Sequence, residues 1–136
     1  MQRRRSILIL IGIFIIAGCC PRLNIPNPDF KKCEVKTLVD MIYKDVMKAL
    51  SGPNLENPTF LKQSEFEKEW KHRTVNWSLL LVDLETKAIA AGNTELANSA
   101  IFLNSTVSQL PESVEPYRRM RLTTLKNGVE RLKKAL

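Results

Sequence analysis

Apolar residues recur at spacings of three and four through four consecutive stretches of this 136-residue chain. Such spacing places them on one face of an α-helix, which returns to the same side about every 3.6 residues. The last two stretches are the most regular, and they read Leu96, Ala100, Leu103, Val107, Leu110 and then Leu122, Leu125, Val129, Leu132, Leu136. No stretch shows the alternation of a strand. The chain is therefore predicted to be all-α.

Glycine and proline residues mark the ends of the predicted helices. Gly52-Pro53 follows the first helix, Gly92 follows the second and Pro111 follows the third, while Ser113 can cap the fourth. The expected helices cover 34–50, 64–91, 95–110 and 114–136. Short links make neighbouring helices antiparallel, and the axes of such helices cross at about 20°. We expect a small antiparallel bundle of four helices, or of three with the first helix crossing them.

The second predicted helix is apolar on two faces. Its inner stripe comprises Phe66, Trp70, Trp77, Leu80 or Leu81, Leu84, Ala88 and Ala91. A second face begins at Val75 and continues through Leu79 and Val82. A helix that is apolar on most sides is usually buried, so this helix is expected to be the central one. The two tryptophans are expected in the core, the alternative being an aromatic groove for a partner helix or peptide.

The first eighteen residues have the layout of an export signal. Three arginines at positions 3–5 precede an apolar run over 6–16, and the small residues Ala17 and Gly18 follow. This order is typical of a secretory leader. The segment from Ser6 to Cys20 has fifteen residues, whereas a helix needs about 20 to cross a bilayer core. Cleavage is therefore favoured over a permanent anchor, with a tilted anchor in a thinned bilayer as the alternative.

The sequence Ile16-Ala17-Gly18-Cys19 resembles the lipobox of bacterial lipoproteins. The resemblance implies that a diacylglycerol is attached to the sulfur of Cys19 and that the leader, residues 1–18, is removed before it. Two or more acyl chains anchor a protein stably, whereas one chain binds only marginally. Because Cys20 and not Asp follows the lipidated residue, the resemblance also implies the outer membrane, facing the periplasm. The alternative is ordinary cleavage one residue later.

The other two cysteines, Cys20 and Cys33, border a Pro-containing linker over 19–33 that precedes the helical domain, 34–136. In an exported, oxidising compartment these two thiols are candidates for a disulfide. Closing a loop of this size stabilises a fold by about 3 kcal/mol. The alternative is a free or intermolecular thiol. With one histidine in the chain, a cysteine-rich zinc site is not expected, and no cofactor is expected.

The net charge of +7 is unevenly distributed. From Tyr117 to the end the chain has seven cationic residues and one acidic residue, Glu130, for a net charge of +6, whereas residues 19–116 carry a net charge of −2. Cations confined to one terminal helix indicate an anionic membrane surface or an acidic partner more than a nucleic acid. The simpler interpretation of these cations is a solvated helix face without a partner. The candidate contact residues are Arg118, Arg119, Arg121, Lys126, Lys133 and Lys134.

No catalytic motif stands out. His72, between Lys71 and Arg73, is expected on a solvated helix face. Glu65, Glu67 and Glu69 point to different sides of the second predicted helix, which suits a solvated helix start and not a carboxylate pair or a metal site. Asp83 and Glu85 become catalytic candidates only if one of them is buried. We therefore expect a non-enzymatic binding or assembly module for another envelope component. The alternatives are a phage or mobile-element lipoprotein in lysis, spanin-like, or in superinfection exclusion, and, third, a small envelope enzyme.

Overall fold

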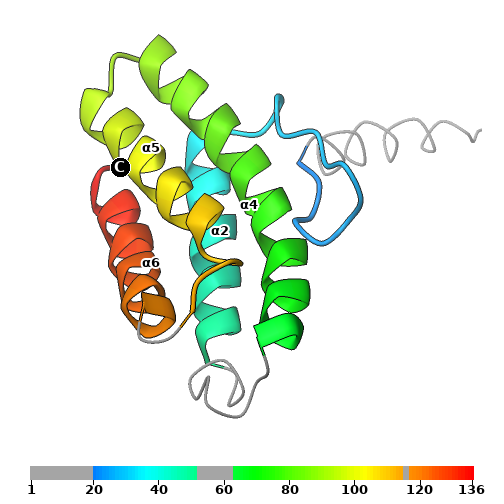
Figure 1. Ribbon diagram of the computed structural model, residues 1–136. Helices are drawn as coiled ribbons and strands as arrows, with labels where there is room; N and C mark the ends of the chain where they lie inside the picture. Colours follow the sequence, from blue (N-terminus) through cyan, green and yellow to red (C-terminus); the bar gives the residue numbers. More distant parts are fainter. Residues whose placement is uncertain (1–19, 52–62, 115–116) are drawn as a thin grey trace, which may run out of the picture.

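The computed structural model describes residues 20–51, 63–114 and 117–136. Within these ranges the chain contains four helices and no strand (Figure 1). The helices are α2 (Val35–Leu50), α4 (Gln63–Ala90), α5 (Thr94–Gln109) and α6 (Tyr117–Lys134). The all-α prediction and the four-helix alternative are confirmed. The leader, the lipobox cysteine Cys19 and residues 52–62, between the first two predicted helices, lie outside the described residues.

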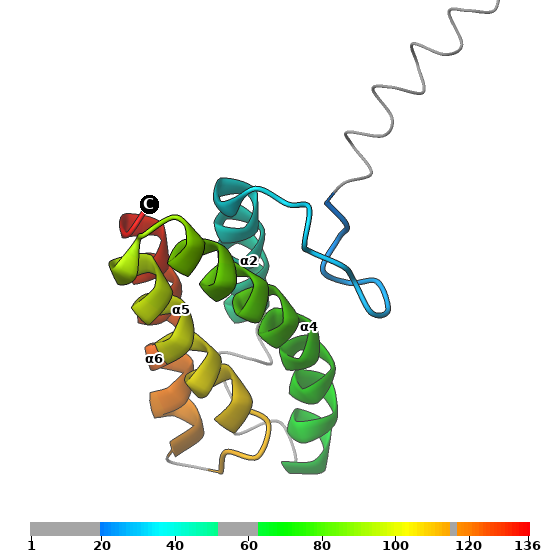
Figure 2. The same cartoon turned by 90° about the horizontal axis from the view of Figure 1, so that it is seen from above.

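The helices pack as a ring of neighbours. α4 packs mainly on α5, α5 on α6, α6 on α2, and α2 closes the ring against α4. Figure 2 shows α5 and α6 on one side of the bundle, with the N-terminal linker on the opposite side, next to α2 and α4. Each helix therefore has two main partners and leaves one side outward.

The apolar stripes meet in the middle of this ring. Trp70 and Trp77 are fully buried, as expected for core residues, and their ring centroids lie 5.7 Å apart in an edge-on arrangement. Phe66 stacks on Trp70 at the same centroid distance of 5.7 Å. The indole Nε1 of Trp77 donates to Oδ2 of Asp45 at 2.7 Å, which joins α4 to α2. The other helices contribute, among others, Leu38, Ile42, Val46, Leu96, Leu103, Val107, Leu125, Val129 and Leu132.

The turn between α4 and α5 is held by its polar residues. Gly92 takes φ +75°, a conformation open to glycine because it has no Cβ. The side-chain oxygen of Asn93 accepts from the Leu96 N–H at 3.1 Å and so caps α5. Its Nδ2 donates to the Ala135 carbonyl, also at 3.1 Å. One residue thus connects the start of α5 to the end of the chain.

The second apolar face of α4 is not buried, and our expectation of a helix enclosed on both faces was wrong. Val75, Leu79 and Val82 are 41–54% exposed. In a ring of four helices α4 contacts two neighbours and turns its third side outward. The extra apolar residues lie on that outward side, and Ala91, expected in the inner stripe, is also exposed.

Candidate functional site

The linker that precedes α2 is packed onto the helices. Cys20 and Cys33 form the predicted disulfide, with their Cα atoms 4.9 Å apart. The sulfur of Cys20 lies 3.4 Å from that of Met41 on α2. Phe30 is fully buried within the linker, and Leu23 is nearly so. The linker is therefore part of the core and not a flexible spacer.

Two polar side chains of α4 hold the linker backbone. Nδ2 of Asn76 donates to the carbonyls of Leu23 and Ile25, the latter at 3.0 Å. Farther along α4, the ammonium of Lys87 donates to the carbonyl of Lys31. These contacts fix the linker at two points about 16 Å apart along the helix. Sequence reasoning missed both residues, because a polar residue on a helix gives no sign that it will hydrogen-bond to a segment more than fifty residues away in the chain.

Three cations line an open groove on the linker side of α2. Arg22, Lys44 and Lys48 border this groove of about 320 Å³ together with Asp45 and Met41, and Met41 contacts Cys20. All three cationic residues are exposed, and Lys44 forms an ion pair of 3.4 Å with Asp40 one turn earlier on α2. Their charges therefore reach solvent on the side of α2 that the linker covers.

The cations predicted on the last helix separate into two sets, and the prediction for Arg118 was wrong. This side chain is only 3% exposed, and its guanidinium carbon lies 4.0 Å from the centroid of the Phe66 ring. Its Nε donates to the Ser113 carbonyl at 3.4 Å. Arg121 is half-buried and donates to Ser113 Oγ at 2.7 Å. Both arginines contribute to packing between α6 and the segment before it, and Arg118 offers no charge at the surface.

The remaining predicted cations, Arg119, Lys126, Lys133 and Lys134, are exposed. Three of them are seven residues apart and so form a row along one side of α6. The row faces α2, since the ammonium of Lys133 lies 4.3 Å from the centroid of the Tyr43 ring. A basic surface on α6 therefore exists, but it is narrower than the sequence indicated.

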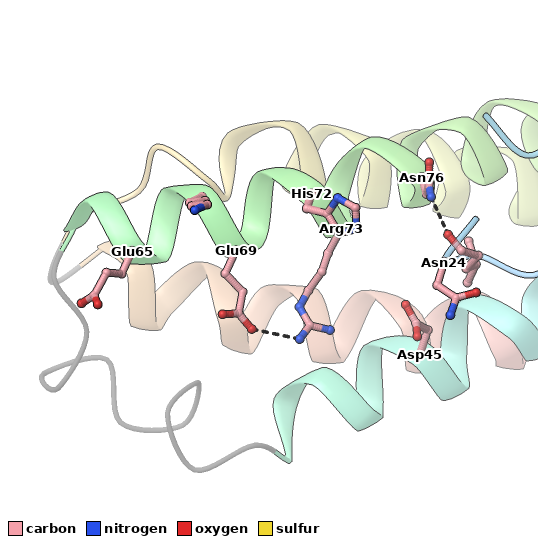
Figure 3. A pocket seen from close by; sticks show the side chains of 9 residues that line it. Asn24, Asp45, Glu65, Glu69, His72, Arg73 and Asn76 are labelled. Carbon is pink, nitrogen blue, oxygen red and sulfur yellow. Dashed lines mark hydrogen bonds and ion pairs between the residues drawn. The ribbon is translucent and has the colours of Figure 1, made fainter. Parts of the chain in front are cut away.

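A cavity of about 650 Å³ lies between the first half of α4, α2 and the linker (Figure 3). Most of its lining residues are polar or charged, of both signs, and they include Asn24, Asp45, Glu65, Glu69, His72, Arg73 and Asn76, but much of the lining surface is apolar. An ion pair of 3.1 Å joins Arg73 to Glu69 one turn earlier on α4. We assign no ligand to the cavity.

The candidate catalytic residues are not brought together in the described part of the chain. His72 lines this cavity but is exposed, and the half-buried Asp83 and Glu85 are not among its lining residues. In the ranges that the structure covers, no group of three or more His, Cys, Asp or Glu side chains is placed to hold a metal ion. None of the described helices has the combined length and hydropathy that crossing a bilayer requires.

The described residues thus define a small helical bundle with a disulfide-clamped linker at its N-terminal end. Comparisons of the chain with protein-family models, with curated proteins and with solved structures found no match. Its function is therefore argued from these residues and their geometry.

Proposed function

We propose that this protein is an envelope lipoprotein, anchored through acyl chains on Cys19, that serves as a non-enzymatic binding or assembly module. The observation that carries the proposal is the lipobox followed at once by a cysteine of the disulfide. Disulfides persist in oxidising compartments such as the periplasm, which supports export. The proposed location is the outer membrane, with the bundle facing the periplasm.

The clamped linker gives the anchor an orientation. Consecutive Cα atoms are about 3.8 Å apart, so the lipidated residue is a few ångströms from Cys20, which the disulfide fixes to the bundle. Such an anchor has no free spacer, and it holds the disulfide end of the bundle against the headgroups. The cations of the groove next to Met41, which are Arg22, Lys44 and Lys48, then lie on the membrane-facing side, and each cation near an anionic surface contributes about 1 kcal/mol.

Mass spectrometry of the native product tests the anchor. We expect a chain that begins at Cys19 and carries the mass of a diacylglycerol, with or without an N-acyl group. Cys19→Ser should yield a chain without acyl mass, and the same variant expressed without residues 1–18 should leave the membrane fraction without detergent. Cys33→Ser is the matched control, because it removes the disulfide and leaves the lipobox intact, so acyl mass and membrane association should remain. An intact leader, or a mature N-terminus without acyl mass, would refute the anchor.

The orientation is tested with the Cys19→Ser chain and vesicles that contain phosphatidylglycerol. Replacing Arg22, Lys44 and Lys48 with Gln should weaken binding by about 100-fold, from three contributions of about 1 kcal/mol each. The matched variant replaces Arg119, Lys126 and Lys133 on α6. If the α6 variant loses more affinity than the linker-side variant, the basic row of α6 is the membrane contact and the proposed orientation is wrong.

A further inference from the structure

The outward side of α4 changes character along the helix. Before Val75 the exposed positions are mostly charged, whereas from Val75 to Ala90 none of the exposed positions carries a charge, and the charged residues Asp83, Glu85 and Lys87 are half-buried. In this second half, Val75, Leu79, Val82 and Ile89 are 41–61% exposed. With Thr86 between them, they are spaced four, three, four and three residues apart, as are the a and d positions of a coiled-coil seam. An exposed apolar stripe of this kind marks an interaction surface.

The stripe continues onto α5. Ser78 Oγ donates to Asn104 Oδ1 at 2.8 Å, which sets this point of α4 beside α5. Val82 lies one turn after Ser78, and Ile101 lies one turn before Asn104. Because the two helices are antiparallel, Val82 and Ile101 face outward next to each other, and Ile101 is 46% exposed. The chain has no Lys or Arg between residues 88 and 117, so this side of α5 adds no cation.

The charges at the positions of α4 that flank the stripe are acidic. On a heptad helix the positions beside the seam are occupied here by Asn76, Asp83 and Ala90 on one edge and by Ser78 and Glu85 on the other. Asp83 and Glu85 are the charged residues among these five. The ammonium of Lys87 is directed to the Lys31 carbonyl in the linker, and Lys71 lies beyond the end of the stripe, one turn before Val75. In coiled coils such flanking charges determine the partner.

We propose that this face, formed by Val75, Leu79, Val82, Ile89 and Ile101, binds an amphipathic helix of another protein whose apolar seam is flanked by Lys or Arg. The inference deepens the proposed binding role and rests on it for its biological setting. A second copy of the chain is a poorer occupant, because antiparallel pairing about Val82 places the two Asp83 carboxylates on the same edge. A bilayer is also a poorer occupant, since anionic headgroups repel the acidic edges.

Two synthetic helical peptides with Leu at the seam positions test the inference, one with Lys and one with Glu at the flanking positions. They are titrated, by fluorescence anisotropy, against the native product in phosphatidylcholine nanodiscs, with empty nanodiscs as the blank. The chain without its three leader arginines has a net charge of +4, so non-specific attraction favours the Glu peptide. We expect the Lys peptide to bind at least about 10-fold tighter, because the local acidic edges determine binding.

Variants locate the binding. Val82→Asp should weaken binding of the Lys peptide by at least about 10-fold, the usual scale for an interface-centre residue. Met120→Asp is the matched control, because Met120 is similarly exposed but lies on α6, and it should bind as the wild type does. The double variant D83K/E85K, which leaves the apolar residues in place, should reverse the preference in favour of the Glu peptide. It keeps the test decisive even if V82D does not fold.

Three outcomes would overturn the inference. The first is a wild-type preference for the Glu peptide, and the second is an unchanged affinity in folded V82D. The third is a dimer, seen by sedimentation equilibrium, that V82D dissociates, since it would assign the face to a second copy. If mass spectrometry finds no lipid, the proposed anchor fails, but the same titration without nanodiscs still tests this face.

Discussion

Removing the buried guanidinium of Arg118 should destabilise the bundle as much as removing a core aliphatic side chain. The group lies 4.0 Å from the Phe66 ring centroid and is shielded from water. A desolvated cation–π contact contributes about 2 kcal/mol, and the long 3.4 Å hydrogen bond to the Ser113 carbonyl adds up to about 1 kcal/mol. Arg118→Ala is therefore expected to lower the free energy of unfolding by about 2–3 kcal/mol.

The measurement is urea unfolding at neutral pH, followed by the fluorescence of the two buried tryptophans. Lys126→Ala is the matched control, because Lys126 is an exposed cation of the same helix and surface substitutions usually change stability by no more than about 0.5 kcal/mol. Arg118→Met retains an unbranched stem against the ring and removes the charge, so its cost should fall between those of the other two.

The result that would refute this reasoning is a small effect. If Arg118→Ala costs no more than Lys126→Ala, the guanidinium is solvated, and Arg118 returns to the basic surface that the sequence suggested. Added salt provides a second check, because a contact shielded from water is screened much less than an exposed charge pair. The difference between the two alanine variants should therefore persist at about 1 M salt.

Three further substitutions probe the packing and the linker. Cys33→Ser, or reduction of the wild-type disulfide, should lower the free energy of unfolding by about 3 kcal/mol, and a reductant should then cause no further loss in the Cys33→Ser variant. Gly128→Ala places a Cβ 2.7 Å from Cδ1 of Leu103, so that the Leu103 side chain must shift. Overpacking of this kind costs about 1–3 kcal/mol, against about 1 kcal/mol gained in helix propensity. A melting temperature raised by the substitution would contradict the tight contact between α5 and α6. Trp77→Phe removes the 2.7 Å hydrogen bond to Asp45 and should lower the free energy of unfolding by about 1–3 kcal/mol, because the carboxylate loses its donor. In a chain that already carries Asp45→Ala, the same substitution should lower the free energy of unfolding by less.

Much of the fold follows from local pattern. The regular stripes of α5 and α6 put Leu103, Val107, Leu125 and Val129 in the core, where they are fully buried. Spacing alone predicts such positions, because each apolar residue has only one side of its helix on which to lie. The disulfide was also predicted without tertiary information, because two thiols remain once Cys19 is assigned to the lipid and an oxidising compartment favours their pairing. These predictions required no knowledge of which helices would be neighbours.

Arg118 shows where local pattern stops being sufficient. Its place in a run of cations at 118, 119 and 121 indicates a solvated face, and two of its neighbours in that run do reach solvent at least in part. Its burial depends on Phe66, fifty-two positions earlier in the chain and on another helix. An arginine can lie in a core when a ring covers its planar face and a carbonyl accepts its N–H. Neither partner is visible in the sequence near Arg118.

The second apolar face of α4 shows a different limit. Its pattern is as regular as a core stripe, and the sequence gives no means of telling whether the residues that cover it belong to the same chain. The packing of the helices answers this question, because α2 and α5 already contact α4 and Val75, Leu79 and Val82 are still exposed. The linker occupies the adjacent edge, where Asn76 and Lys87 hold it, and it leaves the stripe uncovered. The clamped linker at one edge and the open apolar seam beside it are what the proposed membrane-held module would need in order to receive a partner helix.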